Sequence, residues 1–520
     1  MSSKEEYIFW RLAQFFIAKI GYRIVQLSEN QKELWLEKLE NKKTPVIRIL
    51  AHSLDWSNRM QRDIEFTAEN GEKIRKQLGR GELNVLNIYI SSYPPVDDYQ
   101  DRLKEPFVSP DNKKTAVLTM IMAQGEYERG FEKLTTLFGF DPSFSINEAY
   151  SEQEISEIKK NSLDFAVKKE RKEREVFANG KPLFTYMFIL IQVAMFFWLE
   201  LHGGSTNTST LIQYGAKFNP LIYKGEWWRF ITPVFLHIGF LHLAMNTLAL
   251  YYLGMEVERI YGSLRFLFIY LFAGVTGFIA SFLFSSSLSA GASGAIFGCF
   301  GALLYFGAIY PKLFYRTMGI NLFVVLAINL AFGFTASGID NAGHIGGLVG
   351  GFLAAGVGFF PKKKKPLLQI LFFLLAAAAV WGSLSYGFRD TVRAKDIGSN
   401  LILAQDYIKN HQYNEAYQVL QETEKNAAKP TAQLYFLLSF SEIKKGMLPE
   451  ARDHLERAIK LKPNFHEAYY NLALIYLEEN NLIQAKKNAE KAVKLNPEQK
   501  EYSNLVNEIN VHIQSSGGGV

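Results

Sequence analysis

Hydrophobic positions are distributed unevenly along this chain. Between residues 183 and 387, apolar residues form seven runs, each about long enough to cross the ~30 Å hydrocarbon layer of a bilayer as an α-helix. The segments before and after this region mix charged and apolar positions, as water-soluble domains do. The pattern therefore predicts a polytopic α-helical membrane protein with a soluble region at each end. The predicted spans are residues 183–201, 236–255, 264–284, 290–310, 318–336, 341–360 and 367–387.

The first soluble region reads as an α/β domain over residues 1–165. Short β-rich runs follow an amphipathic helix, and a long charged helix leads into a run, LNVLNIYIS, that alternates like a half-buried strand. A basic juxtamembrane linker, residues 166–182, leads into the first span. The predicted elements are a helix at 5–20, strands at 22–28, 33–38 and 45–51, a helix at 55–78 and a strand at 83–91.

The second soluble region contains an internal repeat. Pro463 and Pro497 are 34 residues apart, and small and aromatic residues recur at the same spacing before each of them. This period resembles the tetratricopeptide repeat, a helix–turn–helix unit that stacks on its neighbours. We expect an all-α array over residues 397–514, whose concave face binds segments of partner proteins or which serves only as a structural cap. The recurring pairs are Tyr435 and Tyr469, Leu438 and Leu472, Ala451 and Ala485, and Ala458 and Ala492.

Lysine and arginine predict the orientation of the spans. They cluster in the linker and in the run from Lys362 to Lys365, within the segment 361–387 that carries a basic loop and the seventh span. The loops 285–289 and 337–340, which would lie on the other side of the membrane, contain neither lysine nor arginine. The positive-inside rule places the N-terminus in the cytoplasm, and seven spans then place the C-terminus outside. Arg389, Arg393 and Lys395 oppose this orientation weakly.

Composition excludes several classes of protein. The 41 Phe, 26 Tyr and 7 Trp exclude a chain that is disordered throughout. The one cysteine, Cys299, excludes an intrachain disulfide framework and a cysteine-based zinc cluster. The net charge of +6 is small for 520 residues and does not indicate a nucleic-acid partner.

A few polar residues lie within the predicted spans, where burial is costly and a functional reason is expected. His242 and Asn246 lie one helical turn apart in the second span, Ser293 lies near the start of the fourth, and His344 near the start of the sixth. These three spans run in the same direction, so all four side chains fall in the outer half of the bilayer. A hydroxyl, imidazoles and an amide at one depth are the groups that a serine nucleophile, its base and an oxyanion hole require.

Glycines favour a close approach of the helices that carry these groups. Gly294 and Gly298 recur on one face of the fourth span, and Gly347 and Gly351 on one face of the sixth. Faces of small residues at this spacing let two helices pack backbone to backbone. Such packing is what a hydrogen bond between Ser293 and His344 needs.

Together these motifs resemble the rhomboid intramembrane serine proteases, over a six-span core at residues 183–360. The resemblance includes the subgroup of Gram-positive bacteria that adds a soluble N-terminal domain, a seventh span and C-terminal tetratricopeptide repeats. It implies a Ser293–His344 dyad, an oxyanion hole with His242 and Asn246, and cleavage of membrane proteins in or near transmembrane segments without a cofactor. The motifs are Gly291-Ala292-Ser293-Gly294 with Gly298, Gly343-His344 with Gly347 and Gly351, His242 with Asn246, and Trp228-Arg229 in the first outer loop.

Other functions and roles are open at this stage. The chain could act as an adaptor or scaffold that binds membrane clients without proteolysis. A transporter would also use glycine-rich helices, but no intramembrane charge pair or inverted repeat is visible. Asp340 precedes His344 by four residues, a position more typical of a helix N-cap than of a third catalytic residue. Phe297 stands where some rhomboid proteases carry a tyrosine that stacks on the histidine, and a phenyl ring can also stack.

The N-terminal domain suggests one metal site. His52, Asp55 and Asp63 fall where the third strand meets the long helix, and an imidazole with carboxylates would suit Mn²⁺ or Zn²⁺. The alternative is that Asp55 caps the helix and Asp63 pairs with Arg59 or Arg62.

Overall fold

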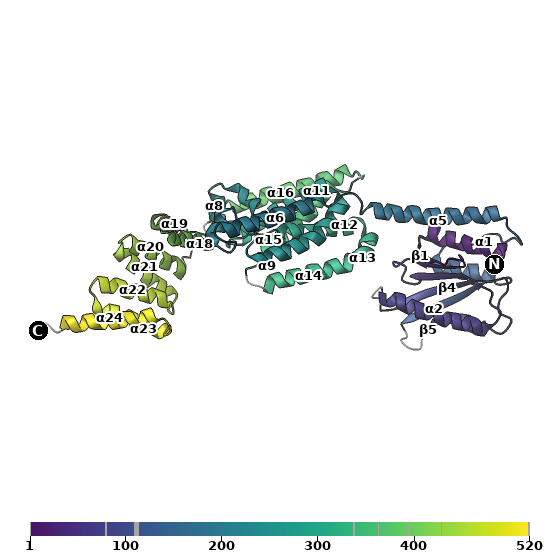
Figure 1. Cartoon of the computed structure of the whole chain (residues 1–520), viewed down its shortest axis with the longest axis horizontal. Helices are drawn as coiled ribbons and strands as arrows, with labels where there is room; N and C mark the ends of the chain where they lie inside the picture. Colours follow the sequence, from purple (N-terminus) through teal and green to yellow (C-terminus); the bar gives the residue numbers. More distant parts are fainter. Residues whose placement is uncertain are drawn as a thin grey trace. The chain divides into compact units, whose positions relative to one another are not determined.

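The computed structural model describes residues 2–77, 81–108, 114–335, 338–361, 363–393, 396–427 and 429–517. Lys362 and Lys395, which enter the charge argument, lie outside these residues. The chain divides into two compact units, Met1–Val176 and Phe177–Val520. Figure 1 shows the elements of both.

The first unit is built on a six-stranded sheet in the order β1-β2-β3-β4-β6-β5. Helices α1 and α5 cover one face and α2 covers the other (Figure 1). Strands β3, β4 and β6 are parallel neighbours, and α2 makes the crossover between the first two. The strands are β1 (Arg23–Leu27), β2 (Glu33–Glu37), β3 (Val46–Ala51), β4 (Leu83–Ile90), β5 (Phe107–Val108) and β6 (Thr115–Met122). The helices are α1 (Ser3–Gln14), the π-helical turn η1 (Phe15–Ile20), α2 (Ser57–Gln77), α3 (Asp101–Lys104), α4 (Tyr127–Phe138) and α5 (Glu152–Glu175).

Successive side chains of β4 point to opposite faces of the sheet, and this explains the two layers of the core. Val85 and Tyr89 face α2, whereas Leu86, Ile88 and Ile90 pack with α1. The expected strands at 22–28, 33–38, 45–51 and 83–91 correspond to β1 to β4. No sequence pattern predicted β5, β6 and α4. Helix α5 also runs past the predicted domain boundary at residue 165 and ends at Glu175.

In the second unit, a helix occupies each of the seven predicted spans. The match is poorest for the second, where η3, a 3₁₀ turn, ends at Phe235 and the α-helix begins only at Phe240. The elements are α6 (Leu183–Leu201), α7 (Thr208–Gln213), α8 (Asn219–Tyr223), η2 (Trp227–Phe230), η3 (Thr232–Phe235), α9 (Phe240–Ala249), η4 (Leu250–Gly254), α10 (Met255–Tyr261), α11 (Ser263–Phe284), α12 (Ser293–Ile309), α13 (Pro311–Thr317), α14 (Gly319–Thr335), α15 (Asn341–Gly358), α16 (Pro366–Gly387) and α17 (Asp390–Arg393).

Length and hydropathy identify fewer membrane-crossing helices than the seven predicted. Among the described residues, α6, α11 and α16 are each long and apolar enough to cross a bilayer. The pair α13 and α14 would be a fourth if its two helices, bent by 72° at their junction, form one span. Helix α12 is apolar but shorter. The structure therefore supports a helical membrane region without fixing the number of spans.

The C-terminal part is an all-α array of helix pairs followed by a closing helix. Alanines and leucines at the repeated positions, such as Ala451, Leu455, Ala485 and Ala489, are buried between adjacent helices. Small residues there let the helices pack closely, as the 34-residue period predicts. The helices are α18 (Ile397–Lys409), α19 (Tyr413–Asn426), α20 (Ala432–Lys444), α21 (Leu448–Leu461), α22 (His466–Glu478), α23 (Leu482–Leu495) and α24 (Lys500–Gly517).

Candidate active site

Ser293 and His344 lie at the start of two neighbouring helices. Ser293 is the first residue of α12, and His344 lies in the first turn of α15. The distance between Ser293 Oγ and His344 Nε2 is 2.8 Å, within hydrogen-bonding range. A hydroxyl and an imidazole in this geometry can form a nucleophile and its general base.

Glycine-to-glycine contacts bring the two helices this close. A Cβ on Gly347 would lie 1.9 Å from the carbonyl oxygen of Gly294, and a Cβ on Gly351 would lie 2.1 Å from that of Gly298. Helix α11 joins the same contact, since a Cβ on Gly277 would lie 2.8 Å from the carbonyl oxygen of Gly343. Three helix backbones thus meet where any side chain would separate them.

The His344 ring is held by stacking. Its plane lies nearly parallel to the Phe297 ring, at 10° and 4.3 Å between centroids. Among the described residues, no hydrogen-bond partner reaches His344 Nδ1. Asp340 is engaged elsewhere, because its Oδ1 accepts from the backbone N–H of Gly343 at 2.9 Å and so caps α15. Within the described part of the chain, no carboxylate therefore bonds the side of the imidazole that faces away from Ser293.

His242 packs beside the loop that precedes Ser293. A Cβ on Gly291 would lie 2.8 Å from His242 Nε2, so only glycine leaves room for the ring. His242 Nδ1 faces the backbone N–H of Ile238 at 3.4 Å. If Nδ1 accepts that hydrogen, the neutral ring carries its proton on Nε2, the atom that faces Gly291.

Asn246, the other predicted oxyanion residue, lies one helical turn after His242 on α9. Its Nδ2 donates to the backbone carbonyl of His242 at 2.9 Å, within its own helix. The side chain is nearly buried, with 6% of its surface exposed. The amide lies on the same helix as His242. In the described structure, its hydrogen bond holds it to that helix and not to Ser293 Oγ.

The Trp228-Arg229 motif organises the loop between α6 and α9. Arg229 Nη1 donates to the backbone carbonyls of Ile212 and Ala216, both at 2.8 Å, and Nε donates to Glu226 at 2.7 Å. The Arg229 side chain is buried, whereas Trp228 is exposed. One side chain thereby fixes a loop of short helices, α7 and α8, that the sequence analysis left undescribed.

Comparison with known proteins identifies this architecture. The Rhomboid domain model matches residues 224–360, and two tetratricopeptide-repeat models match residues 441–480 and 466–499. Rhomboid protease GluP of Bacillus subtilis (strain 168) is 44% identical over 481 residues, which cover 91% of this chain and 92% of that protein. The chain belongs to the rhomboid family.

Two further relatives share only part of the chain. Putative rhomboid protease YdcA of Bacillus subtilis is 34% identical and covers 37% of this chain and 94% of its own length. RHOMBOID-like protein 1 of Arabidopsis thaliana is 35% identical over 30% of this chain and 43% of its own. Rhomboids are intramembrane serine proteases, and this chain is a serine endopeptidase of that class, with tetratricopeptide repeats at its C-terminus. The second tetratricopeptide-repeat domain of human RPAP3, bound to an HSP70 peptide, matches 21% of this chain and 92% of its own with 18% identity and a TM-score of 0.20.

Two residues beside Ser293 and His344 form contacts that the sequence did not indicate. His237 is fully buried, and its Nε2 faces the backbone N–H of Ala292 at 3.4 Å. Ser289 Oγ donates to Asp340 Oδ2 at 2.7 Å. The polarity of His237 was visible in the sequence, but nothing there indicated the bond between Ser289 and Asp340, which lie 51 residues apart.

The predicted metal ligands are not brought together. Both oxygens of Asp63 are bonded to Arg48, at 2.5 and 3.2 Å, and Tyr89 donates to the same carboxylate at 2.5 Å. The partner is therefore Arg48 of β3, not Arg59 or Arg62. His52 and Asp55 form no metal-binding group with it, since the described residues contain no cluster of three His, Cys, Asp or Glu suited to a cation.

The helix cap expected from Asp55 is also supplied by another residue. Asp97 accepts from the backbone N–H of Ser57 at 2.6 Å and from its hydroxyl at 2.5 Å, at the start of α2. Asp55 itself is exposed. The predicted Mn²⁺ or Zn²⁺ site at His52, Asp55 and Asp63 thus has no ligand set in the described structure.

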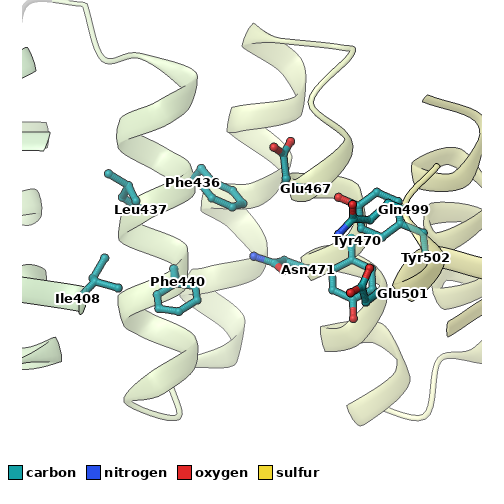
Figure 2. Close-up of a pocket in the computed structure, with 10 residues that line it drawn as sticks. All are labelled: Ile408, Phe436, Leu437, Phe440, Glu467, Tyr470, Asn471, Gln499, Glu501 and Tyr502. Atoms are coloured by element: carbon teal, nitrogen blue, oxygen red, sulfur yellow. The ribbon is translucent and has the colours of Figure 1, made fainter. Parts of the chain in front are cut away.

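The tetratricopeptide array has a pocket of about 460 Å³ between its helices (Figure 2). Ile408, Leu437, Phe436 and Phe440 line one side, and Tyr470, Tyr502, Gln499 and Glu501 lie on the other. Its lining comes from α18, α20, α22 and the start of α24, and consists of Ile408, Phe436, Leu437, Phe440, Glu467, Tyr470, Asn471, Gln499, Glu501 and Tyr502.

Proposed function

We propose that this rhomboid protease cleaves membrane proteins in or near a transmembrane segment through a Ser293–His344 dyad. The observation that carries the proposal is the 2.8 Å contact between Ser293 Oγ and His344 Nε2. His344 takes the hydroxyl proton as Ser293 attacks the scissile carbonyl, and returns it to the leaving amine. The direct test is removal of the Ser293 hydroxyl, which should end cleavage.

Substrates must expose a peptide bond to reach this site. Transmembrane helices with Gly or Pro near the scissile bond unwind more readily, because their backbone hydrogen bonding is weaker. Small residues beside the bond would also fit against the crowded glycine contacts. The chemistry needs no metal or cofactor, because the imidazole supplies the base and N–H groups stabilise the oxyanion.

The oxyanion donors in this proposal are His242, Asn246 and the backbone N–H of Ser293. His242 is the better supported side chain, since its Nε2 faces Gly291 while Nδ1 faces the Ile238 N–H. Asn246 would have to exchange its bond to the His242 carbonyl for one to the oxyanion.

We expect His242→Ala to lower kcat by about 10²–10³, with little change in KM, because the donor acts on charge that develops in the transition state. Cleavage kinetics on a model transmembrane substrate in nanodiscs would measure both constants. His202→Ala is the matched control, because His202 is exposed and stacks on Trp198 away from the dyad. A rise in KM alone would assign His242 to substrate positioning.

We also propose that the N-terminal domain is cytoplasmic and the repeats lie outside the plasma membrane. The basic linker before α6 and the lysines before α16 support this orientation. The dyad, near the starts of α12 and α15, would then open toward the outer face.

Reporter fusions test this orientation. An alkaline phosphatase fused after residue 396 should be active, because that enzyme needs the oxidising exterior to form its disulfides. The same enzyme fused after residue 178 should be inactive, and immunoblots of both fusions control for expression. Activity at the second point and not at the first would contradict the proposal.

The repeats offer a second site for proteins. Tetratricopeptide repeats bind partner proteins, and the pocket of Figure 2 presents Glu467 and Glu501 beside Phe436, Phe440 and Tyr470. We propose that it binds an apolar segment of a client or substrate that carries a Lys or Arg, with the cation placed near the two carboxylates.

A fluorescent peptide of alternating Leu and Lys, added to the full-length protein in detergent, tests this pocket. We expect Glu467→Gln with Glu501→Gln to weaken binding about fivefold, since exposed ion pairs contribute ~0.2–1 kcal/mol each. Glu490→Gln, on the exposed surface of α23, should leave binding unchanged. Equal binding of a Leu and Glu peptide would contradict the proposed preference.

A further inference from the structure

The dyad depends on the relative position of two loops. Ser293 and His344 belong to the first turns of α12 and α15, so the loops before these helices set how the two side chains meet. Further along, the helices touch through glycines, which make the backbones approach but offer no side chain that interlocks against sliding. A separate contact is needed to fix the register of the two helix starts.

The hydrogen bond from Ser289 Oγ to Asp340 Oδ2 is such a contact. Its length is 2.7 Å, and it joins the residue four before Ser293 to the residue four before His344. Asp340 is itself fixed to α15, because its other oxygen accepts from the Gly343 N–H and its carbonyl accepts from the His344 N–H at 3.1 Å. A shift of Asp340 would therefore move His344 with it.

Ser289 is fixed from the other side. Its backbone pairs with Lys217 in an antiparallel bridge, with N–H to carbonyl distances of 2.8 and 3.1 Å. The Lys217 side chain is fully buried, and its Nζ donates to the carbonyls of Ser285 at 2.6 Å and Ser287 at 3.1 Å. The loop that leads to Ser293 is thus attached to the first outer loop, and Ser289 is held in place to meet Asp340.

Building on the proposed dyad, we propose that Ser289 and Asp340 are positioning residues that fix His344 relative to Ser293 through the hydrogen bond between them. In a Ser–His–Asp triad, the carboxylate orients the imidazole ring directly. Here Phe297 orients the ring by stacking. The Asp340 carboxylate does not touch the ring and instead positions the helix that carries the histidine.

Three variants separate this role from a catalytic carboxylate. Ser289→Ala removes the bond between the loops and leaves the cap of α15 intact. Asp340→Ala removes both. Asp340→Asn keeps the cap, since Asn caps as well as Asp does, and its amide can still bond the Ser289 hydroxyl without carrying a charge.

Cleavage rates should be expressed per active site, counted by the amount of fluorophosphonate bound at saturation, so that misfolded protein does not contribute. We expect Ser289→Ala to lower kcat per labelled site about tenfold with KM nearly unchanged, the size of effect that loss of one hydrogen bond produces. Asp340→Ala should lower it at least as much, and Asp340→Asn should stay within about threefold of wild type. Ser287→Ala, an exposed serine of the same loop, should behave as wild type.

Each outcome bears on a different statement. A Ser289→Ala variant with unchanged kcat per labelled site would overturn the positioning role, as would an Asp340→Asn variant as impaired as Asp340→Ala. If Asp340→Ala fails to fold, Ser289→Ala and Asp340→Asn still decide. Failure of the dyad itself would show separately, as cleavage that survives loss of the Ser293 hydroxyl.

Discussion

Ser293→Ala should abolish cleavage of a transmembrane substrate while the protein stays folded and membrane-inserted. The variant loses the only atom in the proposed dyad that can form the acyl-enzyme, so the rate should fall by a factor on the order of 10⁴ or more. Stability should change little, because the removed hydroxyl is a single small group at the first position of α12.

Gel-based cleavage assays and labelling with a fluorophosphonate would measure this loss. Wild type should be labelled and Ser293→Ala should not, whereas Ser287→Ala should match wild type in both assays. Cleavage at the wild-type rate by the Ser293 variant would exclude Ser293 as the nucleophile.

Gly347→Ala should inactivate the enzyme by forcing the backbones of α12 and α15 apart. The added methyl would lie 1.9 Å from the Gly294 carbonyl oxygen and 2.9 Å from its Cα, and neither atom can rotate away. Helices α12 and α15 must separate, which overpacking data suggest costs about 1–3 kcal/mol or more. A displacement of about 1 Å at a catalytic pair can cost about 10² in rate, so Ser293 and His344 should lose most of their activity.

Thermal unfolding in detergent and the rate of fluorophosphonate labelling would test the glycine contact together. Gly382→Ala in α16 is the matched control, because no atom lies within 4 Å of the Cβ it would add. That variant should be as stable as wild type or slightly more so, given the better helix propensity of alanine. If Gly347→Ala and Gly382→Ala show the same unfolding temperature and the same labelling rate, close packing at Gly347 is not what holds Ser293 near His344.

The helices and the glycine faces could be predicted because their signals are local. Runs of about 20 apolar residues and glycines four apart reflect bilayer thickness and helix geometry, which hold whatever the rest of the chain does. The start of α9 was placed too early, at residue 236, because Leu236 and Ile238 extend the apolar run through a short loop, and the α-helix begins only at Phe240.

Side-chain partners could not be predicted in the same way. Asp63 was a candidate metal ligand because it falls with His52 and Asp55 where the third strand meets the long helix, but its carboxylate is bonded to Arg48 of β3. The spacing of His242 and Asn246 indicated a shared helix face and could not indicate that the amide bonds its own backbone. The bond between Ser289 and Asp340 depends on how two distant loops fold, which no local pattern records.

Cys299 gives this protein a practical advantage. It is the only cysteine in the sequence, and it is fully buried within α12, six residues beyond Ser293. A thiol shielded in this way reacts slowly with maleimides or methanethiosulfonates, so the unmodified sequence already serves as a low-background parent for labelling. Single cysteines placed at exposed positions such as Ser287 or Glu490 could then carry spin labels or dyes, and motions near the dyad could be followed without replacing any residue that packs against it.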